Sequence, residues 1–424
     1  MKKLMFIAAA GLIALSASAQ DKEALKLEKK AIKEAESLVK KAQSTFDGCI
    51  ANPQMGRKET NFEKLDGARD LIDQALGNKY LTDNVQLYKV AADIYNQYYS
   101  KLEKEVAADE SKQPEFLGTA QKVATYCMKY DSLYNLDPKK KEPEYKTAHT
   151  LYQTIGINPI LKLLMAAQTK SNSDDQAEIK SAAGYADVVV NALTKSGLFK
   201  DFTHDNKAEW IDYAKVFKAQ SLVNVEGADP AKVEDAYMQL KGTKYEATAY
   251  QALANFYKEK DKNKFVEYLK LGMEKGGDEA YPTFAFQLMM YQFQNELKDD
   301  CLKTIQDIKV KCPDNDNTVR AYLMEGQIYF EKKDFEKAEK LFREAVEKFP
   351  DEEQAIPMPA RSAWMKAQTT QDKKDMQHAI DLFKELQEKY PDNSDFWGEP
   401  LYILYNNVSN FKERDKYKKY YNVK

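Results

Sequence analysis

The sequence predicts an all-α protein in which antiparallel helix pairs stack side by side into a solenoid. Lys, Glu, Ala, Leu and Tyr dominate its 424 residues, whereas glycine (16) and proline (13) are sparse, and this composition favours helices. Three amphipathic segments toward the C-terminal end repeat one pattern, and another amphipathic segment precedes each of them. Because a single helix pair cannot bury its apolar face alone, recurring pairs predict a stacked array.

Residues 1–19 have the layout of a secretory signal peptide. "MKK" supplies a positive start, "LMFIAAAGLIAL" an apolar run, and "SASAQ" small residues around a cut expected before Gln20. The run is shorter than the about 20 apolar residues of a membrane anchor, and no other stretch is apolar enough to span a bilayer. No Cys follows the cut, which disfavours a lipoprotein. We therefore expect an exported protein of a bacterial periplasm, with outer-membrane association left open.

The charge balance argues against a nucleic-acid partner. Removal of the signal peptide takes away Lys2 and Lys3, which leaves 62 of the 64 basic residues against 67 acidic ones, a net charge of about −5. Nucleic-acid binding would require a clustered basic face instead.

Three predicted helices can be placed in register on their Pro-Asp ends. They are "DDCLKTIQDIKVKCPD", "FEKAEKLFREAVEKFPD" and "MQHAIDLFKELQEKYPD", which end at Pro313, Pro350 and Pro391. A small residue precedes each proline by twelve positions (Cys301, Ala338, Ala379), and a large apolar residue follows four positions later (Ile305, Phe342, Phe383). Three positions further on lie Ile308, Ala345 and Leu386. These coincident spacings indicate three copies of one helix.

The helix before each copy completes a longer pattern. Twelve residues before the small residue lie Met289, Gly326 and Ala367. In the middle copy, Tyr322, Gly326 and Tyr329 precede Ala338, Phe342, Ala345 and Pro350. This resembles the tetratricopeptide repeat (TPR) family, whose first helix carries an aromatic residue, a small residue and Tyr, and whose second carries Ala, Phe and Ala before Pro. The copy departs from the family at Glu325, where Leu is usual. The resemblance implies a right-handed superhelix, and together with the layout of residues 1–19 it predicts an exported bacterial TPR protein.

The repeated residues have a packing reason. Small residues at Gly326 and Ala338 let two antiparallel helices approach closely, and Phe342 and Tyr329 fill the space between a pair and its neighbours. Pro350 ends the second helix. We assign the same packing roles to Ala345 and, in the third copy, to Ala379, Phe383 and Pro391.

The clearest repeats are residues 282–313, 319–350 and 360–391. The flanking two are weaker, because Met289 and Gln292 replace the small residue and the Tyr of the first, and Thr370 replaces the Tyr of the third. We predict a TPR array over residues 205–424 and degenerate TPR-like pairs over residues 20–204. A distinct N-terminal helical domain is the competing interpretation.

The sequence carries no motif for catalysis, metal binding or a cofactor. His149, His204 and His378 have no second ligand at metal-site spacing, and H-E-x-x-H, C-x-x-C, G-x-S-x-G and phosphate-binding glycine loops are missing. Cys301 and Cys312 would lie roughly 16 Å apart on a helix, too far for a disulfide, whereas pairing of Cys49 and Cys127 stays open. We expect buried apolar thiols, no metal, no cofactor and no enzymatic activity.

The TPR resemblance implies a binding site, because the first helix of each pair in that family lines a concave groove in which peptides dock. The matching residues are Phe286, Met290 and Phe293, then Arg320, Leu323, Gln327 and Phe330, and finally Arg361, Trp364 and Gln368. Two of the chain's six arginines occupy the same position in consecutive repeats. Arg binds carboxylates through paired hydrogen bonds and stacks on aromatic rings. We therefore expect a protein or peptide partner of the cell envelope, with apolar and acidic groups.

Several alternatives stay open. Phe286, Met290 and Phe293 follow helical spacing and also fit a core, and the two arginines also fit ion pairs with neighbouring helices. Some carbohydrate-binding proteins of the outer membrane have TPR-like helices, so a glycan-binding protein is the alternative function. An enzyme in the degenerate N-terminal half is a third. The favoured prediction is a non-enzymatic periplasmic TPR scaffold.

Overall fold

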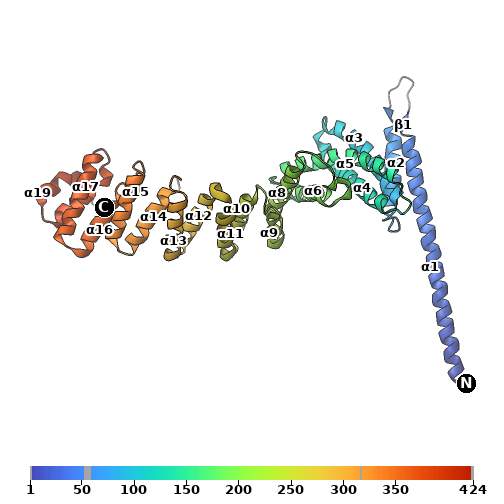
Figure 1. Cartoon of the computed structure of the whole chain (residues 1–424), viewed down its shortest axis with the longest axis horizontal. Coiled ribbons are helices and arrows are strands. Elements are labelled where there is room, and N and C mark those ends of the chain that lie inside the picture. Colours follow the sequence, from blue (N-terminus) through green and yellow to red (C-terminus); the bar gives the residue numbers. More distant parts are fainter. Residues whose placement is uncertain (1, 52–58, 316–317, 422–424) are drawn as a thin grey trace. The chain divides into compact units, whose positions relative to one another are not determined.

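The computed structural model describes the backbone of residues 2–51, 59–315 and 318–421, and the side chains of residues 23–49, 60–315 and 318–421. The chain forms two compact units, Met1–Tyr245 and Glu246–Lys424. Both consist almost entirely of helices joined by loops (Figure 1). The predicted all-α solenoid of helix pairs is therefore confirmed.

Unit 1 begins with the long helix α1 (Lys2–Asp47). Two short antiparallel strands follow it, β1 (Ile50–Ala51) and β2 (Glu59–Thr60), which pair Ile50 with Thr60. Within the described ranges this ladder is the one departure from an all-helical chain. The remaining elements are α2 (Phe62–Leu76), α3 (Val85–Val106), η1 (Glu110–Lys112), α4 (Gln113–Leu136), α5 (Glu142–Lys170), α6 (Gln176–Lys195), α7 (Gly197–Lys200), α8 (Lys207–Asn224) and α9 (Pro230–Met238).

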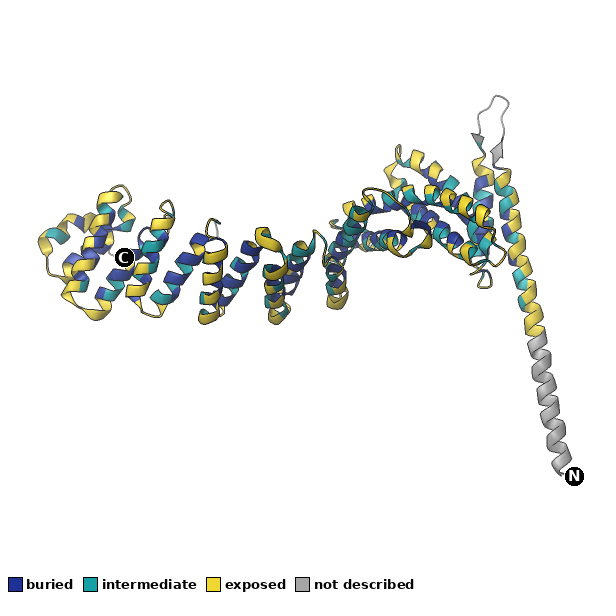
Figure 2. Ribbon diagram, viewed as in Figure 1, coloured by how far each residue is buried: buried dark blue, intermediate teal, exposed yellow. Residues whose placement is uncertain are grey.

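Helices that follow one another in unit 1 pack together, and α2 shows why. Its residues Leu65, Ala68, Ile72 and Ala75 recur every three or four positions, so they share one face, and all are buried. The side chain of Asn61 caps the helix by accepting a hydrogen bond from the Lys64 backbone N–H at 3.0 Å. Such faces join into one core along the unit, visible as dark blue inward-facing segments in Figure 2.

The predicted boundary between residues 204 and 205 falls between α7 and α8, inside unit 1. Helix α8 packs on α6, and Trp210 and Tyr213 of α8 contact the unit 1 core. The two compact units divide after Tyr245. The predicted boundary between a degenerate region and a TPR array stays a prediction.

The predicted signal peptide, residues 1–19, lies in the first part of α1. Its side chains are outside the described ones, so it stays a prediction. Among the residues that the structure describes, no helix combines the length and the apolar character needed to cross a membrane.

Unit 2 is a run of helices in which each packs on the next (Figure 1). The elements are α10 (Glu246–Tyr257), α11 (Lys262–Lys275), α12 (Gly277–Gln294), α13 (Lys298–Lys311), α14 (Thr318–Glu331), α15 (Phe335–Lys348), α16 (Met358–Thr370), α17 (Lys373–Lys389), η2 (Ser394–Phe396), α18 (Gly398–Asn407), α19 (Phe411–Arg414) and η3 (Asp415–Tyr420). The three clearest repeats correspond to the pairs α12–α13, α14–α15 and α16–α17.

The repeated small and aromatic residues lie inside these pairs. Ala338, Phe342, Ala345, Ala379 and Phe383 are all buried. A Cβ atom on Gly326 would lie 2.5 Å from the Phe342 ring, so α14 and α15 approach as closely as the small residue permits. Pro350 and Pro391 each follow a helix end by two residues. Tyr329 is half-buried, with the Lys337 ammonium 3.9 Å from its ring centroid.

The departures from the TPR pattern have polar partners in the neighbouring helix. Glu325 is buried and forms an ion pair with Lys309 of α13, and its other oxygen accepts a hydrogen bond from Gln306 at 3.0 Å. Gln292 is also buried and accepts a hydrogen bond from the Thr304 hydroxyl at 2.8 Å. A polar side chain is therefore tolerated at these two buried positions, because the neighbouring helix supplies its hydrogen-bond partners.

The C-terminal elements fold back onto α17. The buried Trp397 lies edge-on to the rings of Tyr417 and Tyr420, and its indole N–H donates to the Tyr390 carbonyl at 2.9 Å. The Tyr417 hydroxyl donates to Gln387 of α17 at 2.9 Å. These contacts cover the last repeat with an ordered cap.

Candidate functional site

Helices α12, α14 and α16 border an open hollow of about 750 Å³ in unit 2, which we call the groove. It is lined by Phe286, Met290 and Phe293 of α12, Arg320, Leu323, Met324 and Gln327 of α14, Phe342 of α15, Glu353, Gln354 and Pro357 of the loop before α16, Met358 and Arg361 of α16, and Phe396 of η2. The structure thus brings together seven residues that the sequence predicted for a binding site on three different helices.

Two arginines supply positive charge to the groove. The Arg320 guanidinium lies 5.2 Å from the centroid of the Phe286 ring, a cation–π contact that joins α14 to α12. Arg320 and Arg361 are exposed, and neither forms an ion pair with any carboxylate in the described ranges. Arg69, Arg343 and Arg414 each do. The groove arginines therefore keep charged donors directed toward whatever enters the groove.

Aromatic and thioether side chains form the apolar surface of the groove. Phe286 and Phe293 are half-buried, so they pack on the core of the first repeat and still present part of each ring. Met290, Met324 and Met358 are also half-buried. Methionine side chains adapt to irregular partners, and aromatic rings bury large areas at low entropic cost.

Three predicted residues lie outside the groove lining. The Phe330 ring packs edge-on against Phe335, with their centroids 5.3 Å apart. The Trp364 ring packs edge-on against Phe383 at 6.0 Å, and its indole nitrogen is buried. Gln368 is exposed near the end of α16. Their contact with a partner stays a prediction.

Several residues that line the groove were not predicted from the sequence. Phe342 was assigned only to helix packing, and Met324 lies beside the predicted Leu323. The loop residues Glu353 and Gln354 belong to an insertion that the repeat pattern does not describe. Phe396 follows the last repeat, so no register positions it.

The pair of His149 and Asp131 in unit 1 resembles part of a catalytic triad. His149 Nδ1 lies 2.7 Å from Asp131 Oδ1, and Asp131 is buried. The other ring nitrogen lies 3.0 Å from the amide nitrogen of Gln153, which also donates to the Leu198 carbonyl. That nitrogen accepts from Gln153, so it is occupied where a triad would activate a nucleophile. The pair joins α5 to α4, and Gln153 joins α5 to α7.

The cysteines are free and buried at all four positions. Burial raises the pKa of the Cys301 thiol to about 11, which keeps the thiol neutral and unreactive. Within the described part of the chain, no group of three His, Cys, Asp or Glu side chains is placed to hold a metal ion.

Comparison with known proteins gives one family match. Residues 319–352 match the tetratricopeptide repeat, over the α14–α15 pair. No curated protein matches the chain. Among solved structures, yeast Tom70 is similar with 16% identity and a TM-score of 0.26, over 91% of this chain and 84% of that one. The TPR domain of P58(IPK) is similar with 14% identity and a TM-score of 0.25, over 90% of this chain and 100% of that one. Both TM-scores are low, so neither likeness adds to the inference. The match thus identifies one tetratricopeptide repeat, over residues 319–352, within an all-α chain of stacked helices.

Proposed function

We propose that this protein is a non-enzymatic scaffold that holds a protein or peptide partner in the groove lined by α12, α14 and α16. Protein interaction is the function that a TPR fold suggests. The observation that carries the proposal is the gathering of Phe286, Phe293, Arg320 and Arg361 around one hollow. Aromatic and Arg side chains are the types that dominate binding energy at protein interfaces.

The lining also indicates the chemistry of the partner. Phe286, Phe293 and the three methionines fit apolar side chains, and the two guanidinium groups fit carboxylates that neighbouring helices do not supply. Glu353, exposed at the same groove, disfavours a partner that is acidic along its whole length. The proposed ligand is therefore an extended or helical segment with apolar anchors and one or two acidic groups.

We further propose that the partner is a protein of the bacterial cell envelope. The support is the layout of residues 1–19, which is typical of an export signal. Detection of a mature chain that begins at Gln20 in the periplasmic fraction is the expected result. A full-length chain retained in the cytoplasm would contradict the location and leave the groove proposal intact.

The experiment that tests the scaffold compares the wild type with Arg320→Glu/Arg361→Glu in affinity capture from cell envelopes, followed by calorimetric titration of the captured partner. A matched control is Lys340→Glu/Lys384→Glu, which makes the same charge change at exposed sites on α15 and α17. We expect the groove variant to lose about 100-fold or more in affinity, because each reversal removes a charged hydrogen bond and adds repulsion. The control should bind like the wild type. Equal weakening in both variants would reject the groove as the site.

The glycan-binding alternative would gain support from an exposed aromatic platform outside the groove. The exposed rings of Phe62 and Tyr80 each have a lysine ammonium over them, 5.2 Å and 4.9 Å from the ring centroid. The half-buried rings of Tyr402 and Tyr421 stack on each other, with their centroids 4.2 Å apart. The Arg414 guanidinium lies 5.9 Å from the Tyr402 centroid and 4.7 Å from that of Phe411. These faces are already occupied, so we favour the protein partner.

A further inference from the structure

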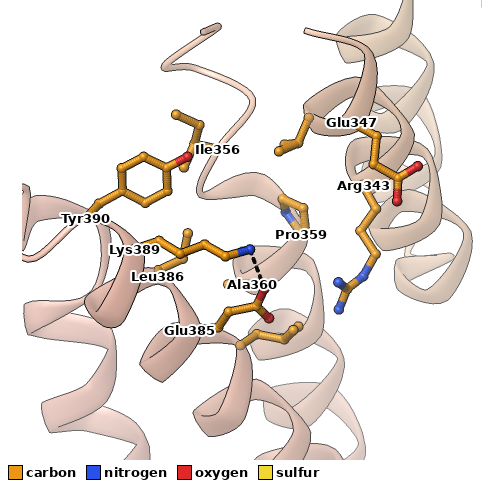
Figure 3. A pocket seen from close by; sticks show the side chains of 11 residues that line it. Arg343, Glu347, Ile356, Pro359, Ala360, Glu385, Leu386, Lys389 and Tyr390 are labelled. Carbon is orange, nitrogen blue, oxygen red and sulfur yellow. Dashed lines mark hydrogen bonds and ion pairs between the residues drawn. The ribbon is translucent and has the colours of Figure 1, made fainter. Parts of the chain in front are cut away.

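A second hollow of about 190 Å³ lies between α15 and α17, over the start of α16, and we call it the α15–α17 hollow. Figure 3 shows Arg343 and Glu347 on one side, Glu385, Leu386 and Lys389 on the other, and Pro359 and Ala360 between them. No residue that lines this hollow also lines the groove. The two hollows therefore have separate linings.

The corresponding place one repeat earlier is filled by an aromatic ring. Tyr322 of α14 is 5% exposed, and its ring centroid lies 3.6 Å from the Lys309 ammonium and 5.8 Å from the Phe349 ring. Ala345 of α15 belongs to the same buried cluster. The ring therefore lies between the second helices of two consecutive repeats, α13 and α15.

Register explains why the next junction is hollow. Tyr322 lies four residues before Gly326, the small residue of its helix. The residue four positions before Ala367, the matching small residue of the next repeat, is Ala363. The residues that match Lys309, Ala345 and Phe349 are Val346, Leu386 and Tyr390, and all three line the α15–α17 hollow. Ala363 does not itself line the hollow, but a side chain at this position leans toward the preceding turn of α16, where Pro359 and Ala360 do line it. The hollow therefore corresponds to the space that the Tyr322 ring occupies in the preceding repeat.

The cation that would face a ring is also in place. Lys348 lies 5.7 Å from the Tyr322 centroid, and its counterpart is Lys389, which lies on the rim of the hollow with its ammonium 2.7 Å from Glu385. The volume is suitable as well, because a cavity of roughly 150 Å³ binds benzene. Charged side chains line one part of the hollow, and Val346, Leu386 and Tyr390 line another. An ammonium beside these apolar side chains favours an electron-rich aromatic ring over a saturated ring of the same size.

We propose that the α15–α17 hollow is a second binding site, which accepts one exposed Phe, Tyr or Trp side chain of a partner protein. The inserted ring takes the place that Tyr322 takes one repeat earlier, between Val346, Leu386 and Tyr390. A side chain of the partner protein then supplies the ring that this repeat lacks, at a site separate from the groove.

The test uses the full-length chain with methyl-labelled Ile, Leu and Val, titrated with p-cresol as an analogue of the Tyr side chain. We expect p-cresol to shift the methyl signals of Val346, Ile356 and Leu386. The saturated counterpart, 4-methylcyclohexanol, should bind more weakly. The groove variant Arg320→Glu/Arg361→Glu should bind p-cresol like the wild type, so failure of one proposal is distinguishable from failure of the other.

Variants locate the bound ring. Ala363→Tyr should fill the hollow and weaken p-cresol binding at least about tenfold. Val346→Phe fills the same space from a half-buried position and serves if Ala363→Tyr does not fold. Lys389→Met should weaken binding about two- to fivefold, the value expected for one cation–π contact. The matched control Lys348→Met, at the filled junction, should leave the affinity unchanged.

Three outcomes would overturn the proposal. The first is the absence of methyl shifts at saturating p-cresol. The second is equal affinity for p-cresol and 4-methylcyclohexanol together with an unchanged Lys389→Met variant, which would make the hollow a general apolar gap. The third is p-cresol binding that disappears as the protein concentration rises, which would assign the hollow to a second copy of this chain.

Discussion

The repeats 319–350 and 360–391 follow one sequence pattern, yet their interiors differ. In the first, Tyr322 fills the space beside α13, and Gly326 lets Phe342 lie against the backbone of α14. In the second, the matching residue is Ala363, and the α15–α17 hollow lies over the preceding turn of α16. The shared pattern therefore specifies a helix pair, whereas the residues that meet across two repeats specify how each junction is filled.

Charges differ between these junctions as well. Glu325 is buried with Lys309, whereas the counterparts of these two residues are Lys366 and Val346. Lys366 reaches outward to Glu336 on α15, with its ammonium 2.5 Å from the carboxylate, and to Asp375 on α17 at 3.0 Å. One junction thus has a buried ion pair and the other a more exposed one, although both lie at the same register.

The largest expected effect comes from Glu325→Leu, which restores the residue typical of the family. The change leaves the Lys309 side chain, 10% exposed, without its carboxylate. We expect the free energy of unfolding to fall by about 3–5 kcal/mol. Urea unfolding, with amide hydrogen exchange resolved over α13 and α14, measures the loss and its location.

Two further variants test whether an unpaired buried charge causes this loss of stability. Lys309→Met/Glu325→Leu should return to the wild-type stability or exceed it, because no charge then remains buried. Lys366→Leu should change stability by no more than about 0.5 kcal/mol, since its partners are more exposed. A neutral Glu325→Leu variant would show that Lys309 escapes to solvent, and the contrast between the junctions would then be smaller than described.

A smaller loss is expected for Tyr322→Ala, which should convert the filled junction into one like its neighbour. Removal of a buried ring costs about 3 kcal/mol. The variant should also gain a second p-cresol site, seen as new shifts at the methyls of Ile308, which does not line the α15–α17 hollow. Protection from hydrogen exchange in α14 and α15 should fall without p-cresol and partly recover with it. No recovery would mean that the junction collapses when the ring is lost.

The smallest effect is expected for Gly326→Ala. The added Cβ would lie 2.5 Å from the Phe342 ring, so overpacking of about 1–3 kcal/mol outweighs the better helix propensity of alanine. We expect a net loss of about 1 kcal/mol in urea unfolding. The control is Gly184→Ala in α6, where nothing lies within 4 Å of the added Cβ. Because only the helix propensity changes there, we expect the free energy of unfolding to rise by about 1 kcal/mol. A stabilised Gly326→Ala variant would show that α14 and α15 can separate freely.

Much of the fold was predictable because its signals are local. The spacing of Ala338, Phe342 and Ala345 defines one helical face, and Pro350 marks the end of the helix. The same periodicity placed Phe286, Met290 and Phe293 on one side of α12, where they line the groove.

The positions of the Trp364 and Phe396 side chains could not be predicted from the repeat pattern. Trp364 holds a groove position in the family pattern, but its ring gains more contact by packing against Phe383. Phe396 has no position in the pattern, and it reaches the groove because the C-terminal cap folds back onto α17. Both outcomes depend on contacts between elements that no local spacing encodes.

The sequence by itself determined the helix pairs, their register and the small residues at which they approach, because a period of 3.6 residues and the turns at prolines are written along the chain. Only the tertiary structure decided that Glu325 is buried against Lys309, that no described carboxylate pairs with Arg320 or Arg361, and that a hollow lies between α15 and α17. The physical reason is that these features depend on which side chains of one repeat meet those of the next. These contacts between repeats depend on loop lengths and on the packing of neighbouring helices, and not on the order of residues within one helix.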